Sequence, residues 1–176
     1  MLKMLYTLFS IGVNILGNRL TTAVLALAFA LGLGQVYAAD HPELDAADEA
    51  YSAENYDKAA ALYRKDAELG VISAQVNLAV MLMDGLGVTQ DFQQAAKWFS
   101  KAAEQGNAEA QYNLGILNQE GKGLAKNPVE AAKWFHIAGA GHSVEGIEKT
   151  MSPEQVAESR KLANEWLANF KNSKGR

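Results

Sequence analysis

The sequence predicts an all-α fold, an α/α solenoid in which antiparallel helix pairs stack on one another. Three observations support this fold class: sequence blocks recur 36 residues apart, apolar residues follow helical spacing, and capping residues and glycines mark helix ends. The chain has 176 residues, a formal net charge of −4 and no cysteine. Disulfides, thiolate nucleophiles and cysteine-based zinc sites are therefore excluded.

Residues 1–38 have the order of charge and hydrophobicity that is typical of a signal peptide. Lys3 and Arg19 are the only charged residues before position 40, and an uncharged, mostly apolar run of about 14 residues follows Arg19. Val36 and Ala38 fit the small-residue positions ahead of a cleavage site. The apolar run is shorter than the roughly 17–25 residues of a membrane-spanning helix. We expect export, to the periplasm or by secretion, with an uncleaved inner-membrane anchor as the alternative.

Two sequence blocks define a repeat in the rest of the chain. Ala-Gln-x-Asn-Leu begins at positions 74 and 110, and Ala-Ala-Lys-Trp-Phe begins at positions 95 and 131. Full repeats are therefore expected over residues 71–106 and 107–142. Residues 39–70 form a weaker N-terminal helix pair, and residues 143–176 form a C-terminal capping helix with a basic tail, because the ends of a repeat array are atypical.

Each repeat reads as two helices joined by a glycine-containing loop. Ala74, Leu78 and Leu82 recur at i, i+4 and i+8, which places them on one helix face. Asp91 and Asn127 are predicted N-caps, and Asn127-x-x-Glu130 and Ser152-x-x-Gln155 are predicted capping boxes. The expected helices cover residues 42–53, 55–69, 72–83, 92–105, 108–119, 128–139, 142–149 and 153–170.

The chain resembles the Sel1-like repeat, a relative of the tetratricopeptide repeat, in the order of three motifs: Ala-x-x-x-Leu-Gly, Gly-x-Gly and Ala-Ala-x-Trp-Phe-x-x-Ala-Ala-x-x-Gly. The resemblance covers residues 74–141 as two copies, while residues 43–70 look closer to a tetratricopeptide unit. It implies a protein–protein interaction module, an adaptor or scaffold. Some relatives act on β-lactams or regulate membrane signalling proteins, so a cell-wall or β-lactam-directed enzyme and a periplasmic regulator are the alternatives.

The residues themselves give little support to catalysis. The only histidines are His41, His136 and His142, and the chain contains neither a Ser-x-x-Lys nor a Gly-x-Ser-x-Gly motif. We therefore expect no enzymatic activity, no cofactor and no metal site. Residues 40–91 hold eleven acidic and three basic residues, a balance that argues against nucleic-acid binding.

A partner is instead expected on the concave side, which the first helix of each pair lines in tetratricopeptide-like arrays. An apolar strip there, edged by carboxylates such as Asp48 and Glu120, favours a protein or peptide that is basic and amphipathic. The alternative is that Val80 and Ile116 belong to the buried core. The predicted partner-binding residues are Leu44, Tyr51, Val76, Val80, Met83, Asp84, Glu109, Tyr112, Ile116 and Gln119.

Overall fold

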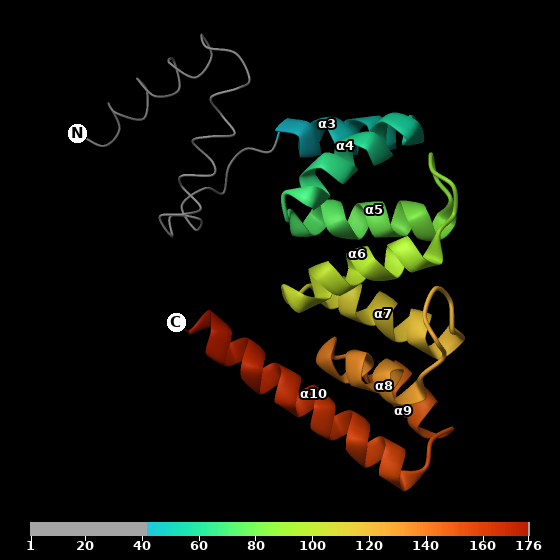
Figure 1. The fold of residues 1–176 in the computed structure, drawn as a ribbon, viewed down its shortest axis with the longest axis vertical. Coiled ribbons are helices and arrows are strands. Elements are labelled where there is room, and N and C mark those ends of the chain that lie inside the picture. Colours follow the sequence, from blue (N-terminus) through green and yellow to red (C-terminus); the bar gives the residue numbers. More distant parts are fainter. Residues whose placement is uncertain (1–41, 176) are drawn as a thin grey trace, which may run out of the picture. The chain divides into compact units, whose positions relative to one another are not determined.

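The computed structural model describes residues 42–175, and over this range the chain is helical with short connecting turns and loops (Figure 1). The all-α fold class is confirmed. The predicted signal peptide, residues 1–38, lies outside the described residues. The described helices are α3 (Pro42–Ser52), α4 (Tyr56–Glu68), α5 (Ile72–Asp84), α6 (Phe92–Glu104), α7 (Ala108–Glu120), α8 (Pro128–Ile137), α9 (Gly141–Glu148) and α10 (Pro153–Lys174).

The first six described helices form three antiparallel pairs in chain order, α3 with α4, α5 with α6 and α7 with α8, while α9 and α10 both pack on α8 (Figure 1). We call α3, α5, α7 and α9 the A helices, and α4, α6, α8 and α10 the B helices. Each expected helix is present with ends within two residues of the prediction, except that α10 continues to Lys174 instead of ending near residue 170.

The predicted N-caps explain where three of the B helices begin. Asp91 accepts a hydrogen bond from the Gln94 backbone N–H, and Ser152 and Gln155 form the reciprocal capping box. Asn127 also caps its helix, but the predicted box around it is incomplete. The Glu130 carboxylate accepts a hydrogen bond from Lys133 Nζ at 2.6 Å, so it is engaged on the helix surface instead of at the N-cap.

Each Gly-x-Gly loop connects the two helices of one repeat and packs against the repeat before it. Gly87 and Gly123 have positive φ angles of 64° and 70°. A Cβ atom at Gly87 would lie 2.2 Å from the carbonyl carbon of Tyr56, and one at Gly123 would lie 2.2 Å from the carbonyl oxygen of Phe92. Each loop therefore packs directly on the start of the preceding B helix, which only glycine permits.

Small residues let the helices approach closely in the core. Alanines such as Ala74 and Ala95 are fully buried, and a Cβ atom at Gly115 would meet the ring of Phe135. Two buried glutamines, Gln75 and Gln111, connect neighbouring repeats: each donates a side-chain hydrogen bond of 3.1 Å to the backbone carbonyl oxygen of a B-helix alanine. The repeat period therefore continues into the packing.

The C-terminal end is closed by α10, which runs along α8 toward the turn between α6 and α7 (Figure 1). Trp134 of α8 packs edge-on against Trp166, with ring centroids 5.9 Å apart, and Trp166 stacks on Phe170 at 4.8 Å. The ring of Phe170 reaches Gly106, where a Cβ atom would lie only 2.4 Å away. Trp98 and Trp134 both pack against the core, which is a structural role.

Candidate partner-binding face

The two helix types differ sharply in charge. In the described part of the chain, the A helices carry nine acidic residues and neither lysine nor arginine. The B helices carry eight acidic and ten basic residues. A face lined by A helices is therefore negative, and its potential favours a positively charged partner.

A hollow of about 350 Å³ is lined by residues of the A helices α3, α5 and α7 and by Tyr63 of α4. Its floor and walls combine carboxylates, phenols, an amide and one apolar side chain. The lining residues are Asp48, Tyr51, Ser52, Tyr63, Asn77, Val80 and Glu109. We call this feature the hollow.

Tyr63 holds one wall of the hollow in place. Its hydroxyl donates a hydrogen bond of 2.5 Å to Asp48 Oδ1, and the tyrosine itself is only 2% exposed. Burial raises the pKa of Tyr63 well above its usual value, and the hydrogen bond to Asp48 raises it further. The phenol therefore stays protonated and remains a donor to the carboxylate.

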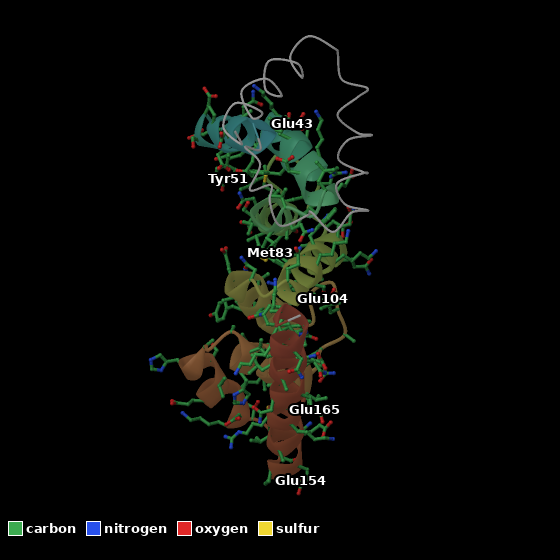
Figure 2. All side chains as sticks on the ribbon, turned by 90° about the vertical axis from the view of Figure 1, so that its left-hand side faces the viewer. Glu43, Tyr51, Met83, Glu104, Glu154 and Glu165 are labelled. Atoms are coloured by element: carbon green, nitrogen blue, oxygen red, sulfur yellow. The ribbon has the colours of Figure 1, made fainter. Side chains whose placement is uncertain are left out.

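Three of the predicted partner-binding residues, Tyr51, Val80 and Glu109, meet in the hollow. Tyr51 and Met83 occupy equivalent positions, one residue before the last residue of α3 and of α5 (Figure 2). Tyr51 is 37% exposed, whereas Met83 is half-buried against the core. Gln119 lies apart from them, in a second hollow of about 560 Å³ beside α9.

Val76 corrects the sequence analysis, because it is 4% exposed and belongs to the core. It therefore offers no surface to a partner. Val80 and Ile116 are half-buried and pack against the core, so the alternative that they belong to the buried core holds in part.

The remaining predicted residues keep some surface. Tyr112 is 38% exposed, and its ring contacts Phe135 at a centroid distance of 5.5 Å. Leu44 is half-buried, and Asp84 and Glu109 are exposed.

Sequence reasoning missed Tyr63 and Asn77 as lining residues. Tyr63 lies on a B helix, which was expected to face away from the partner. A signal was present, because Tyr63 occupies the position that holds Phe99 and Phe135 in the next two repeats, 36 and 72 residues on. The first repeat alone has a hydroxyl there, and a buried hydroxyl needs a partner.

Two searches of the described residues bear on other kinds of site. No group of three or more histidine, aspartate or glutamate side chains in residues 42–175 is arranged to hold a metal ion. Over the same range, no helix has the length and hydrophobicity needed to cross a membrane. His136 instead contacts Glu148 of α9, with 3.0 Å between Nε2 and Oε1.

Comparisons with known proteins agree with this architecture. A model of the Sel1 repeat matches residues 50–71, 72–107 and 108–142. No curated protein matches the chain. Two similar solved structures each share 30% sequence identity with the chain.

One similar structure is a protective antigen of uropathogenic Escherichia coli strains that displays an SLR fold, with a TM-score of 0.70 over 73% of this chain and 30% of the antigen. Another is a Sel1 repeat protein from Oxalobacter formigenes, with a TM-score of 0.52 over 70% of this chain and 55% of that protein. The chain thus spans less than two thirds of the length of either one.

Proposed function

Because the chain belongs to the Sel1 repeat family, we propose that it is an exported adaptor that binds a basic, amphipathic segment of a partner protein on its A-helix face. Sel1 repeats typically mediate protein–protein interactions and generally serve as scaffolds instead of catalysts.

The charge of the A helices carries the choice of face. In the described chain, the A helices carry nine acidic residues, and none of these helices contains a lysine or arginine. The A helices also carry half-buried apolar residues such as Val80 and Ile116. A helix with lysines or arginines along one side and leucines along the other would complement both properties.

Two synthetic amphipathic peptides test this partner chemistry. One carries leucine and lysine, and the other carries leucine and glutamate in the same pattern. Protein purified from cells that express the full chain should bind the lysine peptide in a fluorescence anisotropy titration and leave the glutamate peptide unbound. Equal binding of both peptides would contradict the proposal, because only the lysine peptide complements an acidic face.

A charge reversal tests which face binds. Asp84→Lys with Glu109→Lys should weaken the lysine peptide, and the loss should shrink as salt rises because exposed charges are screened. Glu68→Lys with Glu104→Lys makes the same change in net charge on exposed positions of the B helices and is the matched control. Equal losses in both variants would show that net charge, not the A-helix face, governs binding.

Export is supported by the order of charge and hydrophobicity in residues 1–38. Mass spectrometry of fractionated cells should find a protein that begins at Ala39 and separates with the periplasmic or secreted fraction. Full-length protein in the inner-membrane fraction would favour the uncleaved anchor.

A further inference from the structure

We propose that the hollow between α3, α5 and α7 binds the guanidinium group of an arginine side chain, which anchors the partner segment to the A-helix face. The inference rests on the proposed function and names the residue that this partner must present. The acceptors of the hollow, the hydroxyl of Tyr63 and the exposed ring of Tyr51 support this site.

The hollow presents hydrogen-bond acceptors from three successive A helices. Asp48 comes from α3, Asn77 from α5 and Glu109 from α7. Within residues 42–175, neither Asp48 nor Glu109 is paired with a lysine or arginine, whereas Glu120 is paired with Lys122 at 2.8 Å. The negative charge in the hollow is therefore left for a cation from outside the described chain.

The first repeat builds this arrangement from positions that are apolar later in the array. Asp48 lies four residues before the last residue of α3, and Val80 and Ile116 hold that position in α5 and α7. Tyr63 likewise stands where the later repeats have Phe99 and Phe135. An apolar pair would stabilise the core without a buried hydroxyl, so the polar pair in the first repeat is more than packing requires.

The hydrogen bond from Tyr63 gives Asp48 a fixed orientation. It occupies Oδ1 at 2.5 Å, so Oδ2 is the oxygen that remains for a ligand. A carboxylate that is already oriented loses less conformational entropy on binding than a freely rotating one. The hollow is thus prepared for a donor group before the partner arrives.

Aromatic surface favours guanidinium over ammonium. Tyr51 is 37% exposed, and Tyr56 supports its ring edge-on at a centroid distance of 5.3 Å. A guanidinium group is planar and weakly hydrated, stacks on aromatic rings and directs five donors outward, whereas an ammonium group is a compact and strongly hydrated charge. Acceptors that are spread over three helices suit the wider group.

Three peptides with one shared lysine–leucine sequence test the inference. They differ at a single central position, which holds arginine, lysine or citrulline; citrulline keeps the shape of arginine without its charge. In titration calorimetry, the arginine peptide should bind about tenfold more tightly than the citrulline peptide and several-fold more tightly than the lysine peptide.

Neutral variants of the protein locate the effect. Asp48→Asn with Glu109→Gln should abolish the preference for arginine, while Glu49→Gln with Glu145→Gln removes the same charge from exposed A-helix positions outside the hollow and should preserve it. If the double variant fails to fold, Glu109→Gln alone keeps the test informative, because the Glu109 side chain is exposed and forms no hydrogen bond or ion pair within residues 42–175.

Each outcome separates this inference from the proposed function. Equal affinity for the arginine and lysine peptides would overturn the guanidinium site while the basic partner stands. A preference for arginine that survives in both hollow variants would place the anchor elsewhere. Failure of every basic peptide to bind would overturn the proposed function, and the inference with it.

Discussion

The first helix pair and the last two helices use the same kinds of side chain for opposite purposes. In α3 and α4, the carboxylate of Asp48 and the ring of Tyr51 line an open hollow. In α9 and α10, Glu148 is held by Arg160 at 3.0 and 2.8 Å, and the ring of Trp166 is packed between two other aromatic rings. Acidic and aromatic side chains are thus open to a ligand in the first helix pair, whereas those of α9 and α10 contact one another or neighbouring side chains and stabilise the fold.

The difference follows from what each end must do. In the described chain α10 covers the core beside α8, and an ion pair and stacked rings fix its position. In the first pair, Asp48 has no lysine or arginine partner in the described chain.

The largest effect is expected at the Gly-x-Gly loops, which pack against the preceding repeat. Gly87→Ala should destabilise the protein by about 3 kcal/mol or more, because it combines a strained positive φ with a backbone clash at Tyr56. Gly139→Ala is the matched control: its φ is 71°, yet nothing lies within 4 Å of the new Cβ atom, so only strain of about 1–2 kcal/mol is expected. Urea denaturation of both variants measures the difference, and equal losses would mean that the loop does not pack on α4.

The second prediction concerns the C-terminal aromatic stack. Trp166→Ala should cost about 2–3 kcal/mol, less than a fully buried tryptophan, because Trp166 is half-buried. The damage should be local, since each repeat of a solenoid contacts only its neighbours. Hydrogen exchange should show faster exchange in α8 and α10 and little change in α3 and α4, and affinity for the lysine peptide should be retained. An equal increase in hydrogen exchange in all helices would contradict the expectation that the damage stays near α8 and α10.

The fold was predictable from sequence because its signals are local and repeated. Helical spacing, N-caps such as Asp91 and the glycines recur at the 36-residue period, so each repeat confirms the next. The extension of α10 to Lys174 was missed because that stretch has no copy elsewhere, and its end depends on Phe170 packing at Gly106.

The candidate site was less predictable. A helical face is wide, and the period alone does not tell which flank of it is buried. Val76 therefore turned out to be core. Tyr63 reaches the hollow from a B helix, a contact between different helices that spacing along one helix cannot reveal.

The third prediction concerns how the stability contributed by Glu148 depends on pH. The Arg160 hydrogen bond, aided by the contact with His136, holds the pKa of Glu148 below its usual value of 4.5. Because the folded-state pKa is the lower one, Glu148 contributes stability above about pH 4.5 that is lost as pH falls through the folded-state value. Glu148→Gln should therefore be less stable than the unmodified protein at pH 7, and the gap should close in acid.

Thermal melts between pH 7 and about pH 3, monitored by circular dichroism, test the contribution of Glu148 to stability. Glu145→Gln is the control, since Glu145 is exposed on the same helix and has no ion pair within the described residues. A gap between Glu148→Gln and the unmodified protein that stays constant down to pH 3 would show that the carboxylate charge does not hold α9 and α10 together.

The smallest effect on stability, and the one most specific to binding, comes from giving the first repeat the side chain of the later ones. Tyr63→Phe removes the hydroxyl that orients Asp48, while phenylalanine suits the buried position, as Phe99 and Phe135 show. Because Asp48 is exposed and water can replace the lost donor, stability should change by less than about 1 kcal/mol. Affinity for the arginine peptide should nevertheless fall several-fold, because Asp48 is no longer held for binding.

The reverse change, Phe99→Tyr, should destabilise the protein by about 1–3 kcal/mol, since it buries a hydroxyl in a repeat that has Val80 where the first has Asp48. Unchanged affinity in Tyr63→Phe, while the double variant Asp48→Asn with Glu109→Gln still loses the preference for arginine, would mean that the hollow binds without Asp48 being oriented by Tyr63.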